Sequence, residues 1–225
     1  MPVFFKCLLI LHIAGGTAGL ISGTIASSVT KGNRTHKLSG KIFFWAMLLA
    51  SVAALVLSNL PGHKNVFLFA VGGFTFYMIC SGYRIVHLKR SAKQNIKLFA
   101  VVDYAIFLYG LFFGIYLAYM GVESIIQGEN FGIVPCVFGL VCLNFAKDDY
   151  VMIFKKAPLK QIWIRSHIIR MMGAMIASYT AFLVVNIQMQ PNWILWLAPS
   201  FAGTILIISF LRKYAPKLKK APVSN

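Results

Sequence analysis

Six ionisable residues lie inside or at the edge of long apolar runs in this sequence. They are Arg84, Asp103, Asp148, Asp149, His167 and Arg170. Carboxylates beside guanidinium groups neutralise one another, whereas carboxylates and an imidazole around a cavity can bind ions or exchange protons. A charge in an apolar environment is costly unless it is paired, so these residues either hold the structure together or carry a function. Either role requires several apolar segments to bring them to one level.

The apolar segments are long enough to be membrane-spanning helices. The chain of 225 residues is 59% hydrophobic and only 12% charged, whereas a soluble domain is about 25% charged. A helix needs about 20 apolar residues to cross a bilayer. Seven runs reach this length, at about 3–28, 40–60, 66–88, 98–121, 131–153, 163–187 and 193–212. We therefore expect one all-α domain of seven transmembrane helices over residues 1–212 and a basic tail over 213–225.

The lysines and arginines are distributed asymmetrically between the two sides of these spans. One example is the first connection, "VTKGNRTHKLSGK" at 29–41, which carries four cations and no acid. The odd-numbered connections with their flanks, together with the tail, hold 20 of the 22 Lys and Arg, and only Lys6 and Lys64 fall on the other side. Cytoplasmic segments retain such cations. The pattern predicts a protein of the cytoplasmic (inner) membrane with its N-terminus outside and its C-terminus in the cytoplasm.

The partner that this charge favours is the anionic headgroup layer of the bilayer. A nucleic acid is disfavoured, because the cations are spread over three loops and a tail. Most aromatic residues lie in the spans, and not between the cations as a base-stacking surface requires.

The expected spans place the six ionisable residues at one depth. With a rise of about 1.5 Å per residue, Arg84 and Asp103 lie roughly 10 Å from the midplane toward the cytoplasm. By the same measure the other four lie roughly 7–12 Å from the midplane on that side. Together they form a polar layer in the inner leaflet.

Two interpretations of this layer remain open. In one, Arg84 and Arg170 neutralise Asp103 and Asp148 and pin the helices together, with Asp103 paired to one of the two arginines. In the other, the layer lines a cytoplasm-facing pocket for an ion, a proton or an anionic small molecule. Asp103, His167 and Arg170 would then form its centre, and the protein would handle ions, protons or small molecules.

A third possibility is a metal- or haem-dependent redox or hydrolytic enzyme. His36, His87 and His167, with Asp103, could bind a divalent metal if their helices adjoin. A bis-histidine haem is disfavoured, because His12 is the only histidine near the midplane and has no partner at its depth. We expect His12 to hydrogen-bond a neighbouring helix instead. The sequence has no Gly-rich phosphate loop, GxSxG or HExxH motif, which argues against those enzyme classes.

Small residues recur every four positions in the first span, at Gly15, Gly19 and Gly23. This spacing puts them on one stripe, where another helix can approach closely. We expect packing within the chain first and a homodimer contact second, with Gly110 and Gly114 as a candidate facing stripe. A structural subunit of a larger membrane complex is the remaining alternative function.

Three segments resemble a known family: "LHIAGGTAGLISGTIA", "RTHKLSGKIFFWAMLLAS" with its His-x-x-x-Gly pattern, and "SHIIRMMGAMIASYTAFLVVN". The family is a group of multi-pass bacterial membrane proteins that carry a domain of unknown function. His12, His36, Gly40 and His167 are the positions that match its pattern. The resemblance implies a location in the cytoplasmic membrane and gives no activity or cofactor.

The cation asymmetry generates a topology prediction. A C-terminal reporter that is active only in the cytoplasm should be active, and one that requires export should not, because the 20 retained cations resist translocation. Measuring both fusions in the same strain checks this. Export of the tail would contradict the predicted depth of every residue in the polar layer.

Overall fold

The computed structural model consists of helices and describes residues 2–93, 99–155, 159–191 and 193–215. Its seven long helices are α1 (Pro2–Ser28), α2 (Arg34–Leu57), α3 (Val66–Lys93), α4 (Val101–Ile126), α5 (Ile133–Phe154), α6 (Leu159–Asn186) and α7 (Trp193–Tyr214). A short 3-10 helix, η1 (Asn130–Gly132), precedes α5. All seven are long and apolar enough to cross a membrane, and the described ranges contain no strand. The all-α fold with seven candidate spans is therefore confirmed.

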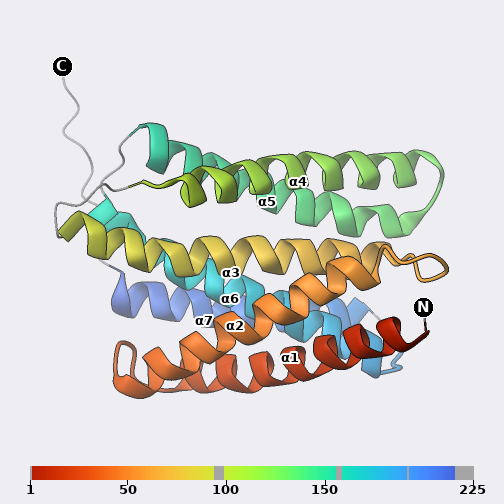
Figure 1. The fold of residues 1–225 in the computed structure, drawn as a ribbon, viewed down its shortest axis with the longest axis horizontal. Helices are drawn as coiled ribbons and strands as arrows, with labels where there is room; N and C mark the ends of the chain where they lie inside the picture. The colour runs from red at the N-terminus through yellow and green to blue at the C-terminus, as the bar shows by residue number, and fades with distance from the viewer. Residues whose placement is uncertain (1, 94–98, 156–158, 192, 216–225) are drawn as a thin grey trace.

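The helices form an up-and-down bundle with α3 at its centre (Figure 1). α3 contacts α2, α4, α5 and α6, while α1 packs mainly on α2 and α7 on α6. In the apolar stretch of α3, 61% of the residues are buried, against 11% in α1 and α7. A helix that is apolar on all sides and buried on few must face lipid or a partner over the rest of its surface. α3 is thus the core of the bundle, and α1 and α7 are its most exposed helices.

The helix ends and their connections lie at two opposite ends of the bundle. The last turns of α1, α3, α5 and α7 and the first turns of α2, α4 and α6 lie at one end of the bundle (Figure 1). The N-terminus and the other connections lie at the opposite end. The cation-rich segments of the sequence all adjoin the first of these ends. Of the cations counted there, Lys97, Lys156, Lys217, Lys219 and Lys220 lie outside the described residues, as does the expected tail from residue 216 onward.

The first cation-rich connection folds as a short capped turn. The Asn33 side chain accepts a hydrogen bond from the amide of His36 at 2.7 Å and caps α2. Lys31 donates to the carbonyl oxygens of Ala26, Ser27 and Val29 at the end of α1, where a cation is favourable. Burial and the neighbouring Lys213 lower the pKa of Lys31.

These caps explain why some helix boundaries differ from the predicted ones. α2 begins at Arg34 and not near residue 40, because Asn33 starts the helix within the polar connection. It ends at Leu57, ahead of Pro61 and of Gly62, whose φ is +77°. α4 begins at Val101, where the Asp103 carboxylate accepts the amide of Ala100 at 2.8 Å. Residues 34–39 had been assigned to the loop, and the residues just before Val101 to the span, because hydropathy alone does not detect a cap.

The glycine stripe of α1 faces α2. A Cβ on Gly15 would lie 2.8 Å from the carbonyl oxygen of Ala46. One on Gly23 would lie 2.8 Å from the ring of Phe43, and one on Gly19 would clash with the side chain of Met47. The stripe therefore serves close packing of two helices within the chain.

The expected facing stripe on α4 was wrong. A Cβ on Gly110 would clash with the ring of Tyr77 on α3, and one on Gly114 would lie 3.1 Å from the carbonyl oxygen of Gly139 on α5. These glycines thus accommodate α3 and α5, and α4 does not pack on the α1 stripe. Small residues reveal that a helix is approached closely, but not which helix approaches.

Neighbouring glycines of α1 allow a matched test of this packing. Gly15→Ala should destabilise the protein by about 1–3 kcal/mol, because the backbone of α2 must move to admit the methyl group. Gly16→Ala should be neutral or slightly stabilising, since nothing lies within 4 Å of its Cβ position and alanine favours a helix. Thermal unfolding of both variants in detergent, followed by circular dichroism, measures the difference. Equal melting temperatures would contradict the close approach of α1 and α2.

Candidate functional site

The candidate site contains two ion pairs at the cation-rich end of the bundle. In the first, Arg84 of α3 binds Asp103 of α4 through two parallel hydrogen bonds. Nε lies 2.7 Å from Oδ1 and Nη2 lies 2.8 Å from Oδ2. The Asp103 side chain is 3% exposed and that of Arg84 is 26% exposed. The expected pairing of Asp103 is therefore present, and of the two arginines considered its partner is Arg84.

The second ion pair is more deeply buried and joins three helices. Arg170 of α6 donates from Nη2 to Oδ1 of Asp149 at 2.6 Å and from Nη1 to Oδ2 at 3.1 Å. Tyr77 of α3 donates its hydroxyl to the same carboxylate at 2.5 Å. Arg170 also donates to the carbonyl oxygen of Phe145 at 3.2 Å. Its side chain is 1% exposed, so it carries a positive charge inside the protein core.

Asp148 does not take the place that was expected for it. The partner of Arg170 is Asp149, and Asp148 is exposed. Successive residues of a helix point about 100° apart, so only one of two adjacent carboxylates can face the same neighbour. Asp148 acts on Arg170 only through its electrostatic field. The expectation that Arg170 neutralises Asp148 was wrong by one residue.

One face of α3 connects the two ion pairs. Tyr77, Ser81, Arg84 and Leu88 follow one another at helical spacing, so they lie on one stripe. Ser81 donates its hydroxyl to the carbonyl oxygen of Tyr77 at 2.7 Å. The sequence interpretation missed Tyr77 and Ser81, although their spacing to Arg84 signals a shared face. An uncharged hydroxyl in an apolar run gives a weaker signal than a charge.

A small cavity lies between the ion pairs. It has a volume of about 20 Å³, which is enough for one water molecule. Its polar lining comes from both ion pairs and from Ser81; the lining residues are Ser81, Arg84, Leu88, Asp103, Ile106, Asp149, Met152 and Ile153. A buried water needs two to four polar partners, and this cavity provides them. A water there would connect Asp149 to Asp103 and Arg84.

Three histidines donate hydrogen bonds to the backbone of neighbouring helices. Nδ1 of His167 lies 2.9 Å from the carbonyl oxygen of Gly82 on α3. Nδ1 of His36 lies 3.0 Å from that of Ala26 on α1, and Nδ1 of His12 lies 2.9 Å from that of Ala50 on α2. A carbonyl oxygen only accepts, so each Nδ1 carries the hydrogen. The helix-to-helix hydrogen bond expected for His12 is present.

The histidines of the polar side do not assemble into the candidate metal site. In the part of the chain that the structure describes, no three His, Cys, Asp or Glu side chains are grouped so that they could hold a metal ion. His36, His87 and His167, with or without Asp103, therefore lack the three or four converging ligands that zinc requires. His87 instead lies with its ring 5.0 Å from the ring of Tyr83. The polar layer is built from ion pairs and a cavity.

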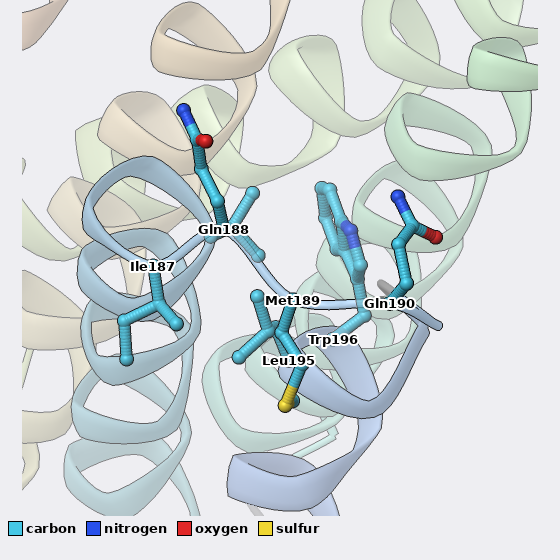
Figure 2. A pocket seen from close by; sticks show the side chains of 7 residues that line it. Ile187, Gln188, Met189, Gln190, Leu195 and Trp196 are labelled. Carbon is cyan, nitrogen blue, oxygen red and sulfur yellow. The ribbon is translucent and has the colours of Figure 1, made fainter.

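A larger cavity opens at the opposite end of the bundle, where α6 ends and α7 begins (Figure 2). Its volume is about 410 Å³ and none of the described residues that line it is ionisable; they are Val184, Ile187, Gln188, Met189, Gln190, Leu195 and Trp196. The segment "IQMQPN" had been interpreted only as a loop. This cavity is separate from the polar layer.

The difference in burial between Asp148 and Asp149 provides a test of the second ion pair. Asp149→Ala should cost about 3–5 kcal/mol, because it leaves the buried Arg170 without a counter-charge. Asp148→Ala, on the exposed position next to it, should change stability by no more than about 0.5 kcal/mol. Asp103→Ala should fall between them, since Arg84 is partly exposed. Unfolding by SDS titration in mixed micelles measures all three, and equal losses for Asp148→Ala and Asp149→Ala would contradict the assignment.

Comparisons with protein-family models, with curated proteins and with solved structures find no match to this chain. The family resemblance of the three quoted segments stays a prediction. The seven apolar helices are consistent with an integral, multi-pass membrane protein.

Proposed function

We propose that this is a protein of the bacterial cytoplasmic membrane that handles protons through its inner-leaflet polar layer. Its N-terminus lies outside and its C-terminus in the cytoplasm. The orientation is supported by the cation-rich segments, which adjoin one end of the bundle (Figure 1). Lysine and arginine remain on the cytoplasmic side of a membrane. The polar layer then lies in the inner leaflet.

The size of the layer's cavity favours a proton over a small molecule. A volume of about 20 Å³ admits one water molecule, whereas small-molecule sites have about 300–1,000 Å³. The charge of the layer also disfavours a metal cation. Asp103 and Asp149, the two carboxylates that line the cavity, are each paired with an arginine, so these four groups carry no net negative charge to retain a cation.

The polar groups form a series from mid-membrane to the cytoplasmic end of the bundle. Tyr77 lies at the middle of the span Val66–Lys89. Asp149 accepts a hydrogen bond from its hydroxyl. The cavity then leads from Asp149 to Asp103 and Arg84. Asp103 in turn accepts a hydrogen bond from the amide of Ala100 at the start of α4. Hydroxyl groups, carboxylates and water are the groups that relay protons in membrane proteins.

The series ends at Tyr77. Beyond it the buried core is mostly apolar and includes Phe74, Phe113 and Leu117, and the buried hydroxyl of Thr75 has no hydrogen-bond partner among the described residues. We therefore assign the layer to gated proton transfer from the cytoplasmic side, in which a conformational change must open this core, and not to a permanently open channel. The observation that carries this proposal is the water-sized cavity lined by both carboxylates.

A structural subunit of a membrane complex is the second candidate function. It is favoured by the extensive hydrogen bonding of the two carboxylates, because Asp103 and Asp149 each accept at least three hydrogen bonds. Groups that are fully hydrogen-bonded stabilise one conformation. In this case the cavity would hold a static water.

Proton flux into proteoliposomes distinguishes the two functions. Vesicles with an internal pH dye and a potassium–valinomycin potential should acidify faster with the protein than without it. Tyr77→Phe and Ser81→Ala should each reduce this rate by at least about tenfold, the lower range of what a positioned proton-transfer group contributes. Asp148→Asn serves as the control and should retain the rate.

Two results would contradict proton handling. One is an acidification rate equal to that of protein-free vesicles. The other is an unchanged rate in both Tyr77→Phe and Ser81→Ala, with both variants monodisperse and folded. Either result would favour the structural subunit.

A further inference from the structure

The cavity at the far end of the bundle has the dimensions of a ligand site. Its volume of about 410 Å³ falls within the range of about 300–1,000 Å³ for small-molecule sites. It lies where the chain leaves α6 after Asn186 and enters α7 at Trp193. Under the proposed orientation this is the outer surface of the membrane. No residue of the polar layer contributes to it, so its function is separate from proton handling.

An aromatic ring forms one firmly held part of its lining. The indole of Trp196 packs edge-on against Phe67 of α3 at 5.1 Å and against Phe131 of η1 at 6.3 Å between ring centroids. The neighbouring Leu195 is buried. Trp196 is therefore fixed by contacts with two other elements, and its remaining surface is available to a ligand.

Two glutamines provide the polar groups. Gln188 and Gln190 are exposed, and neither carboxamide is hydrogen-bonded to another residue in the described part of the chain. Both side chains extend in the same direction as the Trp196 indole, one on each side of it (Figure 2). Each carboxamide has donors and an acceptor. The lining thus combines an apolar ring surface with exposed, neutral hydrogen-bonding groups.

The described residues of the lining carry no charge, and this restricts the ligand. Transfer of an ionised group into such a site is unfavourable when no opposite charge meets it. An uncharged molecule with a ring can stack on Trp196 and exchange hydrogen bonds with the amides. We infer that this cavity binds an uncharged ring compound that carries carbonyl or hydroxyl oxygens, the chemistry shared by a quinone head group and a sugar ring.

Two probes decide whether the ligand is a quinone or a sugar. The protein in phosphatidylcholine nanodiscs would be titrated with decylubiquinone and, separately, with octyl glucoside below its micellar concentration. Tryptophan fluorescence reports binding, and partition into lipid alone gives a linear, unsaturated change. We expect a saturable change with one of the probes. Saturation with decylubiquinone identifies a quinone-type ligand, and saturation with octyl glucoside identifies a sugar.

Two variants distinguish ligand binding in this cavity from unspecific quenching of tryptophan fluorescence. Gln188→Leu with Gln190→Leu retains Trp196 as the reporter and should weaken binding at least about tenfold, which corresponds to about 1.4 kcal/mol. Trp45→Phe removes an indole that is 63% exposed on α2 and should leave the affinity unchanged. Linear titrations with both probes would overturn the inference. So would equal affinities of the wild type and the double variant, provided that their melting temperatures agree.

Discussion

The buried charge of Arg170 imposes the strongest constraint on this structure. A guanidinium that is 1% exposed in the core of a membrane-type bundle must be neutralised and hydrogen-bonded, because its desolvation costs several kcal/mol. Asp149 and the carbonyl oxygen of Phe145 accept three hydrogen bonds from Nη1 and Nη2, and Tyr77 donates to the same carboxylate. The buried Nε of Arg170 has no hydrogen-bond partner among the described residues. Asp149, Phe145 and Tyr77 come from α5 and α3, so the rotation of both helices relative to α6 is set by one side chain.

The other contacts between helices are of two kinds: close packing along the helices, and ion pairs between helices that pack little. α1 with α2, α4 with α5 and α3 with α6 are joined by extensive close packing, in which glycines such as Gly15, Gly82 and Gly139 let the helices approach. α5 and α6 have little or no such packing between them. The hairpin of α4 and α5 is therefore attached to the rest of the bundle through α3 and through the two ion pairs.

Much of this arrangement could be predicted from the sequence. The rest depended on how each helix is rotated about its own axis and on the capping residues at the helix ends. The seven helices were predictable from the length of the apolar runs, and the pairing of Asp103 from the cost of an unpaired charge inside the membrane. The choice of Asp149 over Asp148 depends on which face of α5 meets α6, which hydropathy does not encode. Tyr77 and Ser81 carry no charge and so did not stand out. The cavity beside Trp196 depends on a non-helical segment, whose path is set by tertiary contacts.

The sequence separation within each ion pair bears on how the protein is made. Arg84 and Asp103 are 19 residues apart, and Asp149 and Arg170 are 21 residues apart. At a synthesis rate of 5–20 residues per second, the partner of each charge follows within about 1–4 s. Each pair also closes across a connection at the same end of the bundle (Figure 1). A ribosome would therefore deliver each helical hairpin to the bilayer with its ion pair complete, and neither arginine would need a later segment to neutralise it during insertion.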